Sequence, residues 1–345
     1  MGVQRNPKDS MVSTWRDDPS QWTWRHHILN RLDTWHDREG TKFPVFQKTD
    51  PIPYFTQWST HVWILYHAAW PMLVQAAYYH YTGKNFHPVA AVIFYTLVFQ
   101  INSIHQVKVL SRLAKKVGFL DGDKHGRDPV PDVGVDKVLL SVELTTTIRP
   151  IFTIFLAYNS SQSVSLSPWL PAELFLYSIV LDFFFYVYHR ACHEIDGLWQ
   201  YHRTHHLTKH PNPLLSAYSD TEQEIIEIAL IPLLTYGVLK AFGFPMGFYD
   251  WWVCHQYLIF SEAFGHSGLR ICSSTPGLSS IFLKMVDCEL VVEDHDLHHR
   301  QGWRTSCNYG KQTRLWDRIF GTCGNRIEAK EENVDYVNRV NMPLY

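Results

Sequence analysis

Eight histidines with the spacing of metal ligands lie in two short segments of the C-terminal half. The first segment, HRACHEIDGLWQYHRTHH, combines an HxxxH pair with an HxxHH triplet, and the second, VEDHDLHHR, repeats HxxHH. Because 20 of the 345 residues are histidine, only about 0.07 chance matches to HxxHH are expected in the whole chain. Two matches exceed this number and therefore indicate a functional role for these histidines. The eight residues are His189, His193, His202, His205, His206, His295, His298 and His299.

This spacing suits two metal ions rather than one. On a helix, residues three and four apart share a face, so HxxxH directs two imidazoles toward one point. Adjacent residues diverge by about 100°, so the last two histidines of HxxHH can serve different ions. Eight imidazoles exceed the four protein ligands of a tetrahedral zinc, whereas they fit two five- or six-coordinate irons with a position for dioxygen. The spacing therefore predicts a two-metal centre. Two irons fit it, but imidazole also suits zinc, copper and nickel, so the ligand type alone leaves the metal open. A histidine-rich face without a metal is the alternative.

Further polar residues lie near these segments. His266, in SEAFGHSG, is a candidate ninth ligand. Glu262 precedes it by four residues and shares its helix face, so we predict a catalytic role for Glu262 as a ligand or as acceptor for the N–H of a ligand histidine. A surface or capping glutamate is the alternative. The carboxylates of the second segment, Glu293, Asp294 and Asp296, are expected to support the ligands or to face solvent.

Four apolar blocks precede or adjoin the histidines, at residues 55–79, 89–104, 138–157 and 172–188. Each approaches the ~20 residues that span hydrocarbon. The N-terminal segment and the loop after the second block are basic, whereas NSSQSVSLSPW, which contains the sequon at Asn159, is uncharged. The positive-inside rule therefore places both termini and the histidines in the cytosol. We predict an all-α integral membrane protein with about four transmembrane helices and a cytosolic helical cap that carries the metal site.

Buried helices of a soluble protein are the alternative to these spans, because ionisable residues such as Arg149 and Asp182 are costly in lipid. A further apolar pair, at residues 225–242 and 248–260, is a poor span because of Glu224, Glu227 and Lys240, and we interpret it as an interfacial or re-entrant hairpin. The predicted divisions are a polar cytosolic arm (1–53), a transmembrane region (54–188), a catalytic domain (174–322) and a C-terminal tail (323–345).

The overall charge and the cysteines exclude some classes of protein. Lys and Arg number 31 against 33 for Asp and Glu, a formal net charge of -2, which argues against a nucleic-acid-binding protein. The six cysteines form no CxxC pair, so neither a zinc ribbon nor a dithiol redox motif is present.

The motifs HRACH, HRTHH, HSG and HDLHH, with the closing NYGKQTRLWDRIFGT, resemble the membrane-bound fatty acid hydroxylase/sterol desaturase superfamily. The resemblance covers residues 174–322, and the ending is most similar to the C5-sterol-desaturase branch. It implies a di-iron centre on the cytosolic face of the endoplasmic reticulum, held by the eight histidines above and His266. It also implies O2-dependent hydroxylation or desaturation of an unactivated C–H bond in a lipophilic molecule, such as a sterol, a fatty acyl chain or a terpenoid or polyketide.

The resemblance further implies an external electron donor, cytochrome b5 with its reductase, since the sequence has neither HPGG nor GxGxxG. The basic loop 108–127 and the residues Arg300, Arg304 and Lys311 are expected to dock such a partner or to contact lipid headgroups. Two other functions stay open: a non-enzymatic histidine-rich metal-binding membrane protein, and an aldehyde-cleaving enzyme of the same superfamily.

Overall fold

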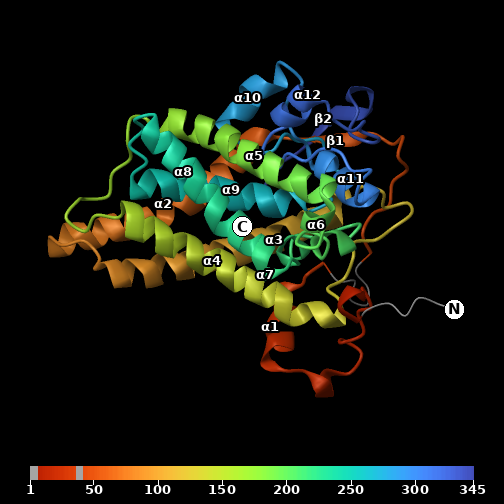
Figure 1. Cartoon of the computed structure of the whole chain (residues 1–345), viewed down its shortest axis with the longest axis horizontal. Coiled ribbons are helices and arrows are strands. Elements are labelled where there is room, and N and C mark those ends of the chain that lie inside the picture. The colour runs from red at the N-terminus through yellow and green to blue at the C-terminus, as the bar shows by residue number, and fades with distance from the viewer. Residues whose placement is uncertain (1–6, 36–41) are drawn as a thin grey trace.

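Long helices packed side by side form the body of the computed structural model, which describes residues 7–35 and 42–345 (Figure 1). The central helix is α9 (Phe248–Gly265), and it contacts each of the other four long helices. These are α2 (Gln57–Thr82), α3 (Pro88–Val117), α4 (Val135–Ala157) and α5 (Leu170–Glu194). Residues 1–6 and 36–41 of the predicted N-terminal arm lie outside the described residues.

Three helical stretches are long and apolar enough to cross a membrane, namely Pro88–Val117, Asp132–Ala157 and Leu170–Glu194. The predicted first span, α2, is also a single helix, of 26 residues. Its many Tyr, Trp, His and Gln residues lower its mean hydropathy, and it is not among the three. The all-α membrane fold is thus confirmed, with three candidate spans where the sequence analysis expected about four.

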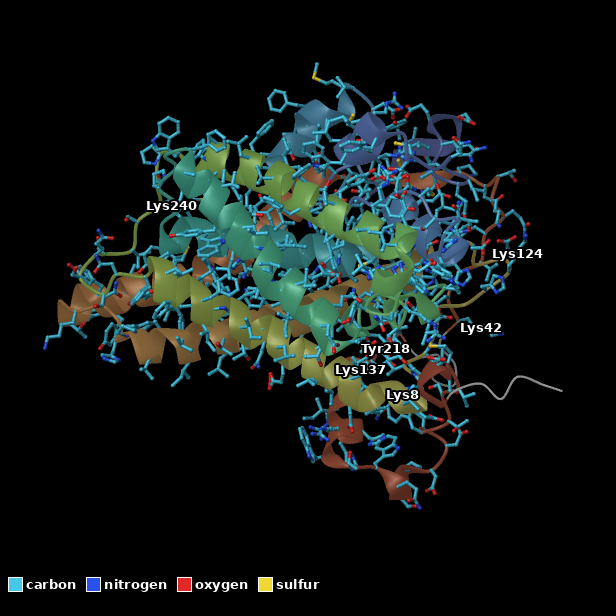
Figure 2. All side chains as sticks on the ribbon, viewed as in Figure 1. Lys8, Lys42, Lys124, Lys137, Tyr218 and Lys240 are labelled. Atoms are coloured by element: carbon cyan, nitrogen blue, oxygen red, sulfur yellow. The ribbon has the colours of Figure 1, made fainter. Side chains whose placement is uncertain are left out.

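The α2–α3 and α4–α5 connections meet at one end of the bundle, whereas the α3–α4 connection, which contains Lys124, lies at the opposite end. In the turn after α2, which ends at Gly83 in the left-handed conformation (φ 66°), the Asn85 side chain donates to the Gln162 carbonyl (2.7 Å). Ser167, in the loop between α4 and α5, donates its N–H to Asp250 at the start of α9 (3.0 Å). Lys240 marks this end and Lys124 the opposite one (Figure 2).

The apolar hairpin at residues 225–260 packs within the bundle. It consists of α7 (Thr221–Glu224), the π-helix η6 (Ile225–Leu230) and α8 (Ile231–Ala241), followed by α9. Its turn lies at the same end as the α2–α3 and α4–α5 connections, where Phe248 contacts Tyr158. The glutamates that suggested an interface precede α9 and have partners inside the protein: Glu224 accepts a hydrogen bond from the Ser219 hydroxyl, and Glu227 lies 3.3 Å from Lys311. A hairpin that enters the bundle and returns to the end at which it starts agrees with the re-entrant alternative rather than with the interfacial one.

Short elements build a cap at the end opposite the turns. Its helices are α6 (Asp196–Trp199), α11 (Val292–Gln301) and α12 (Leu315–Phe320). Helix α10 (Leu278–Lys284) packs beside the first half of α5, where Phe282 contacts Phe175, and α1 (Trp24–Leu32) packs beside α4 and α3. Strands β1 (Ile52–Phe55) and β2 (Val334–Val340) pair in parallel and join the end of the predicted arm to the C-terminal tail. The 3-10 turns are η1 (Pro7–Asp9), η2 (Pro19–Gln21), η3 (Asp132–Gly134), η4 (His205–Leu207), η5 (Leu215–Ala217) and η7 (Glu331–Asn333).

Candidate metal centre

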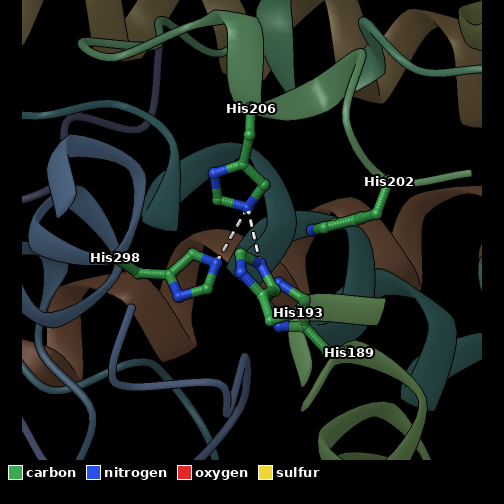
Figure 3. Close-up of side chains that lie close together, drawn as sticks. All are labelled: His189, His193, His202, His206 and His298. Atoms are coloured by element: carbon green, nitrogen blue, oxygen red, sulfur yellow. Dashed lines mark hydrogen bonds between the residues drawn. The ribbon is translucent and has the colours of Figure 1, made fainter. Parts of the chain in front are cut away.

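The structure gathers all nine predicted histidine ligands into two adjoining clusters at the cap end of the bundle. Every one of the nine is buried, and within each cluster one ring nitrogen per residue lies within 4.8 Å of the others. The five-histidine cluster comprises His189, His193, His202, His206 and His298 (Figure 3). The four-histidine cluster comprises His205, His266, His295 and His299.

Adjacent histidines of each HxxHH triplet belong to different clusters. The ring planes of His205 and His206 meet at 88°, and those of His298 and His299 meet at 89°. The second triplet lies on α11, as its spacing predicts. The first triplet does not lie on an α-helix, because α6 ends at Trp199 and residues 200–207 continue as turns and the 3-10 helix η4.

The distances between ring nitrogens fit ligands of a common ion. In Figure 3 the Nε2 atom of His206 lies 3.1 Å from Nε2 of His193 and 3.0 Å from Nε2 of His298. In the four-histidine cluster, Nε2 of His266 lies 3.1 Å from Nε2 of His205 and 3.0 Å from Nε2 of His295. Two imidazoles bound at right angles, each ~2.1 Å from an ion, would have their nitrogens ~3.0 Å apart. The donor set therefore fits a bound metal in each cluster.

Backbone carbonyls hold the opposite edge of several rings. A carbonyl beside Nδ1 selects the tautomer with the proton on Nδ1, which leaves the Nε2 lone pair facing the cluster. The short loops around the cap thus fix the orientation of the ligands. The contacts are His189 with Tyr309 (2.7 Å), His193 with Trp303 (3.3 Å), His266 with Glu262 (2.8 Å), His298 with Cys307 (2.7 Å) and His299 with Thr208 (3.0 Å).

Other ring nitrogens are buried without a partner among the described residues. Both nitrogens of His202 and the Nε2 atoms of His189 and His299 are in this position. Burial, followed by the positive charges of neighbouring histidines, lowers the pKa of His202 well below its ordinary value. Burial likewise lowers the pKa of His299 to about 3. These imidazoles are neutral at pH 7 and therefore in the form that binds metal.

The three carboxylates of α11 fasten this helix to its surroundings. Glu293 accepts hydrogen bonds from the backbone N–H groups of residues 327–329 (2.7–3.0 Å). Asp294 pairs with Arg326 (2.8 Å), and Asp296 pairs with Arg127 (2.6 Å). All three carboxylates are buried, so the alternative that they face solvent is wrong.

Glu262 contributes to the centre through two different groups. Its backbone carbonyl accepts from His266, whereas its carboxylate lies outside both clusters, with Oε1 3.9 Å from Nδ1 of His266. That carboxylate pairs with the buried Lys311, which also lies 3.3 Å from Glu227. Burial acts to lower the pKa of Lys311, but Glu227 and Glu262 outweigh it and raise the pKa above its ordinary value.

The sequence analysis expected Lys311 and Arg300 to dock a protein partner or to contact lipid headgroups, but both side chains form ion pairs within the protein. Lys311 is 6% exposed, and Arg300 pairs with Asp296 (2.5 Å). In the sequence these residues resemble surface cations, because nothing near them in the chain reveals their distant carboxylate partners.

The NYG motif is held from two sides by buried carboxylates. Asp182 of α5 accepts the N–H groups of residues 311 and 312 (2.7 and 2.8 Å). Asp317 of α12 accepts the N–H groups of Tyr309 and Gly310 (both 2.8 Å). A Cβ at Gly310 would lie 2.2 Å from the Thr313 carbonyl, so this tight loop requires glycine. The loop places the Tyr309 carbonyl against His189 and Lys311 against Glu262.

A cavity of about 520 Å³ approaches this centre between α1, α3, α4, η6 and α9. Its walls are largely apolar near α1, with Ile28, Ile104 and Leu139 among them, and Glu227 and Glu262 line it near the centre. An apolar cavity with a few convergent polar groups is typical of a site for a lipophilic ligand.

Comparisons with known proteins agree with the geometry. The family model described as fatty acid hydroxylase matches residues 174–322. The fatty acid hydroxylase vlmA of Lecanicillium sp is 42% identical over 318 residues, which cover 88% of this chain and 87% of that protein. No solved structure matches the chain.

Two further relatives are similar over about half of the chain. An alkylglycerol monooxygenase of Homo sapiens is 28% identical over 200 residues, covering 57% of this chain and 38% of that protein. The methylsterol monooxygenase 1-3 of Arabidopsis thaliana is 28% identical over 184 residues, covering 50% and 58%. The chain is therefore an oxidoreductase, and it belongs to the fatty acid hydroxylase/sterol desaturase superfamily.

Proposed function

We propose that the protein is a membrane-bound di-iron oxygenase that uses O2 and external electrons to hydroxylate an unactivated C–H position of a lipophilic substrate. The observation that carries the proposal is the pair of buried histidine clusters beside a largely apolar cavity, whose lining includes Glu262, 3.9 Å from the ligand His266. Hydroxylation is favoured over desaturation because the relative that is similar over 88% of the chain is named a fatty acid hydroxylase.

The nine histidines would hold the two irons, five around one and four around the other. Bound iron would supply the activation of dioxygen and the abstraction of hydrogen from the substrate. The protein itself would supply the other functions of the site. The cavity orients the substrate, the surrounding helices exclude water, and the backbone carbonyls fix the imidazole tautomers.

Glu262 and Lys311 act as positioning residues in this proposal. Their ion pair lies between the four-histidine cluster and the cavity. It holds the end of α9, and with it the carbonyl that orients His266. A nine-imidazole ligand set brings no negative charge, so the carboxylates of Glu227 and Glu262 would also balance the charge of the irons.

The proposed location is the endoplasmic reticulum membrane, with the cap and its centre in the cytosol. Electrons would come from a cytochrome b5 and its reductase, docked on cations at the cap end. Exposed cations there include Lys108, Arg112, Lys115, Lys116, Lys124 and Arg304. Their charge suits an acidic carrier.

The test compares the lipid metabolites of membranes that carry wild type, His298→Ala or His80→Ala. His80 is an exposed histidine at the end of α2, so its variant controls for the loss of an imidazole as such. We expect an oxygen-dependent hydroxylated product from wild type and His80→Ala, and its loss from His298→Ala. The same metabolite profile in all three membranes would contradict the proposal and favour a metal-binding protein without oxygenase activity.

A further inference from the structure

The cavity contains a buried guanidinium that forms no ion pair with a carboxylate of the described residues. Arg149 of α4 lines the cavity and is 3% exposed. Neither its Nε nor its Nη1 has a hydrogen-bond partner among the described residues, and none of their carboxylates forms an ion pair with it within 4.0 Å. An unpaired buried cation is costly, so a position of this kind points to a ligand with negative charge.

The neighbouring carboxylates are already engaged with other groups. Those close enough to interact electrostatically with Arg149 are Glu262, Glu224 and Glu227. Glu227 and Glu262 share Lys311, and Glu224 accepts a hydrogen bond from the Ser219 hydroxyl. Burial raises the pKa of Glu224 to about 7, so this carboxyl is partly uncharged near neutral pH. Arg149 is thus the cation of this group that forms no ion pair with a carboxylate of the described residues.

The cavity has the shape expected for a chain attached to an anionic group. Along α4 its lining residues run from Asp136 to Arg149, a distance of about 20 Å for a helix. Toward α1 the wall is formed by apolar residues such as Ile28, Leu32 and Leu139, together with the exposed ion pair of Arg25 and Asp136. An extended alkyl chain fits the apolar part, and its charged end would meet Arg149.

We propose, resting on the proposed function, that Arg149 binds the carboxylate of a long-chain acid and thereby selects an acidic amphiphile over neutral lipids. A planar guanidinium matches a carboxylate with two parallel hydrogen bonds, and such charge-assisted bonds are strong where water is excluded. Sterols, alkylglycerols and aldehydes have no group that could form this pair. Arg149 is therefore a specificity-determining residue of the cavity.

Equilibrium binding to the purified protein, without an electron donor, tests this assignment without any turnover. Radiolabelled palmitic acid and methyl palmitate, which differ in the charge of the head group, are titrated against the protein in nanodiscs, with empty nanodiscs as background. Wild type should bind the acid about tenfold or more tightly than the ester. Arg149→Met should abolish the preference, Arg149→Lys should retain part of it, and Arg318→Met, at an exposed arginine, should leave it unchanged.

Equal binding of acid and ester to wild type would overturn the assignment. An Arg149→Met variant that binds both ligands more weakly by the same factor would also overturn it, because such a loss indicates a structural role for Arg149. If Arg149→Met does not fold, the wild-type comparison and Arg149→Lys decide. The outcome is separable from that of the proposed function. A retained acid preference without any oxygenated product would contradict only the oxygenase, and an oxygenated product without the preference would contradict only the role of Arg149.

Discussion

At the scale of single residues, the centre depends on which way each imidazole faces. His205 and His206 are neighbours in the chain, yet their Nε2 atoms contact different clusters. Their spacing is sufficient to predict that they diverge. The partner of each ring cannot be predicted in this way, because His205 approaches His266 and His206 approaches His298 only in the folded chain.

This divergence makes a sharp prediction for neighbouring residues. His205→Ala should remove the iron of the four-histidine cluster, and His206→Ala that of the five-histidine cluster, so each variant should keep about one iron per chain. The double variant should keep about none. Metal analysis of the purified proteins measures this, with His80→Ala as control. Loss of both irons in each single variant would indicate one shared site.

A second residue-scale prediction concerns pH. Because burial raises the pKa of Glu224 from 4.5 to about 7, the folded state binds this proton more tightly than the unfolded state. The stability of wild type relative to Glu224→Gln should therefore fall as the pH rises from 4.5 to 7, by up to about 3 kcal/mol. Thermal unfolding of both proteins across this range measures the difference, and a pH-independent difference would contradict the buried, protonated state.

At the scale of elements, the loop at residues 309–313 connects the bundle to the centre. Asp182 looked anomalous in the sequence as a carboxylate within an apolar span, and the structure explains it as the acceptor for this loop. The same applies to Glu227 of η6, which suggested an interface but pairs with Lys311. In both cases the missing information was the identity of a distant partner, which spacing along the chain does not contain.

Substitution of Asp182 is therefore expected to weaken metal binding, although Asp182 belongs to neither histidine cluster. Asp182→Ala should loosen the loop, release the Tyr309 carbonyl from His189, and weaken iron binding by the five-histidine cluster about 10- to 100-fold. Iron retained during dialysis against a chelator measures this. Asp196→Ala changes an exposed acid at the start of α6 and should retain iron as wild type does. Unchanged retention in Asp182→Ala would contradict the role of the loop.

At the scale of the whole molecule, the helices place the connecting turns at one end and the metal centre at the other. The all-α fold, the nine histidines and the family could be predicted from the sequence, since apolar length, His spacing and the closing motif are local signals. Three features could not be predicted: the division of the histidines into clusters of five and four, the ion pair of Lys311, and the unpaired Arg149. Each depends on contacts between segments that are far apart in the chain.

This difference between the two ends predicts how the protein is oriented in the membrane. An epitope inserted in the loop at residues 158–169 should be protected in cells whose plasma membrane alone is permeabilised, whereas one at the C-terminus should be accessible. The reason is the uncharged loop at one end and the exposed cations at the other. Antibody staining before and after full permeabilisation measures this, and equal accessibility of both epitopes would contradict the proposed orientation.

The measurement that tests the central claim most directly is the metal content of the purified wild-type protein combined with its Mössbauer spectrum. The account predicts about two irons per chain and the spectrum of an interacting pair, because five and four neutral imidazoles face two neighbouring positions. One iron per chain, isolated iron sites, or zinc in place of iron would contradict it.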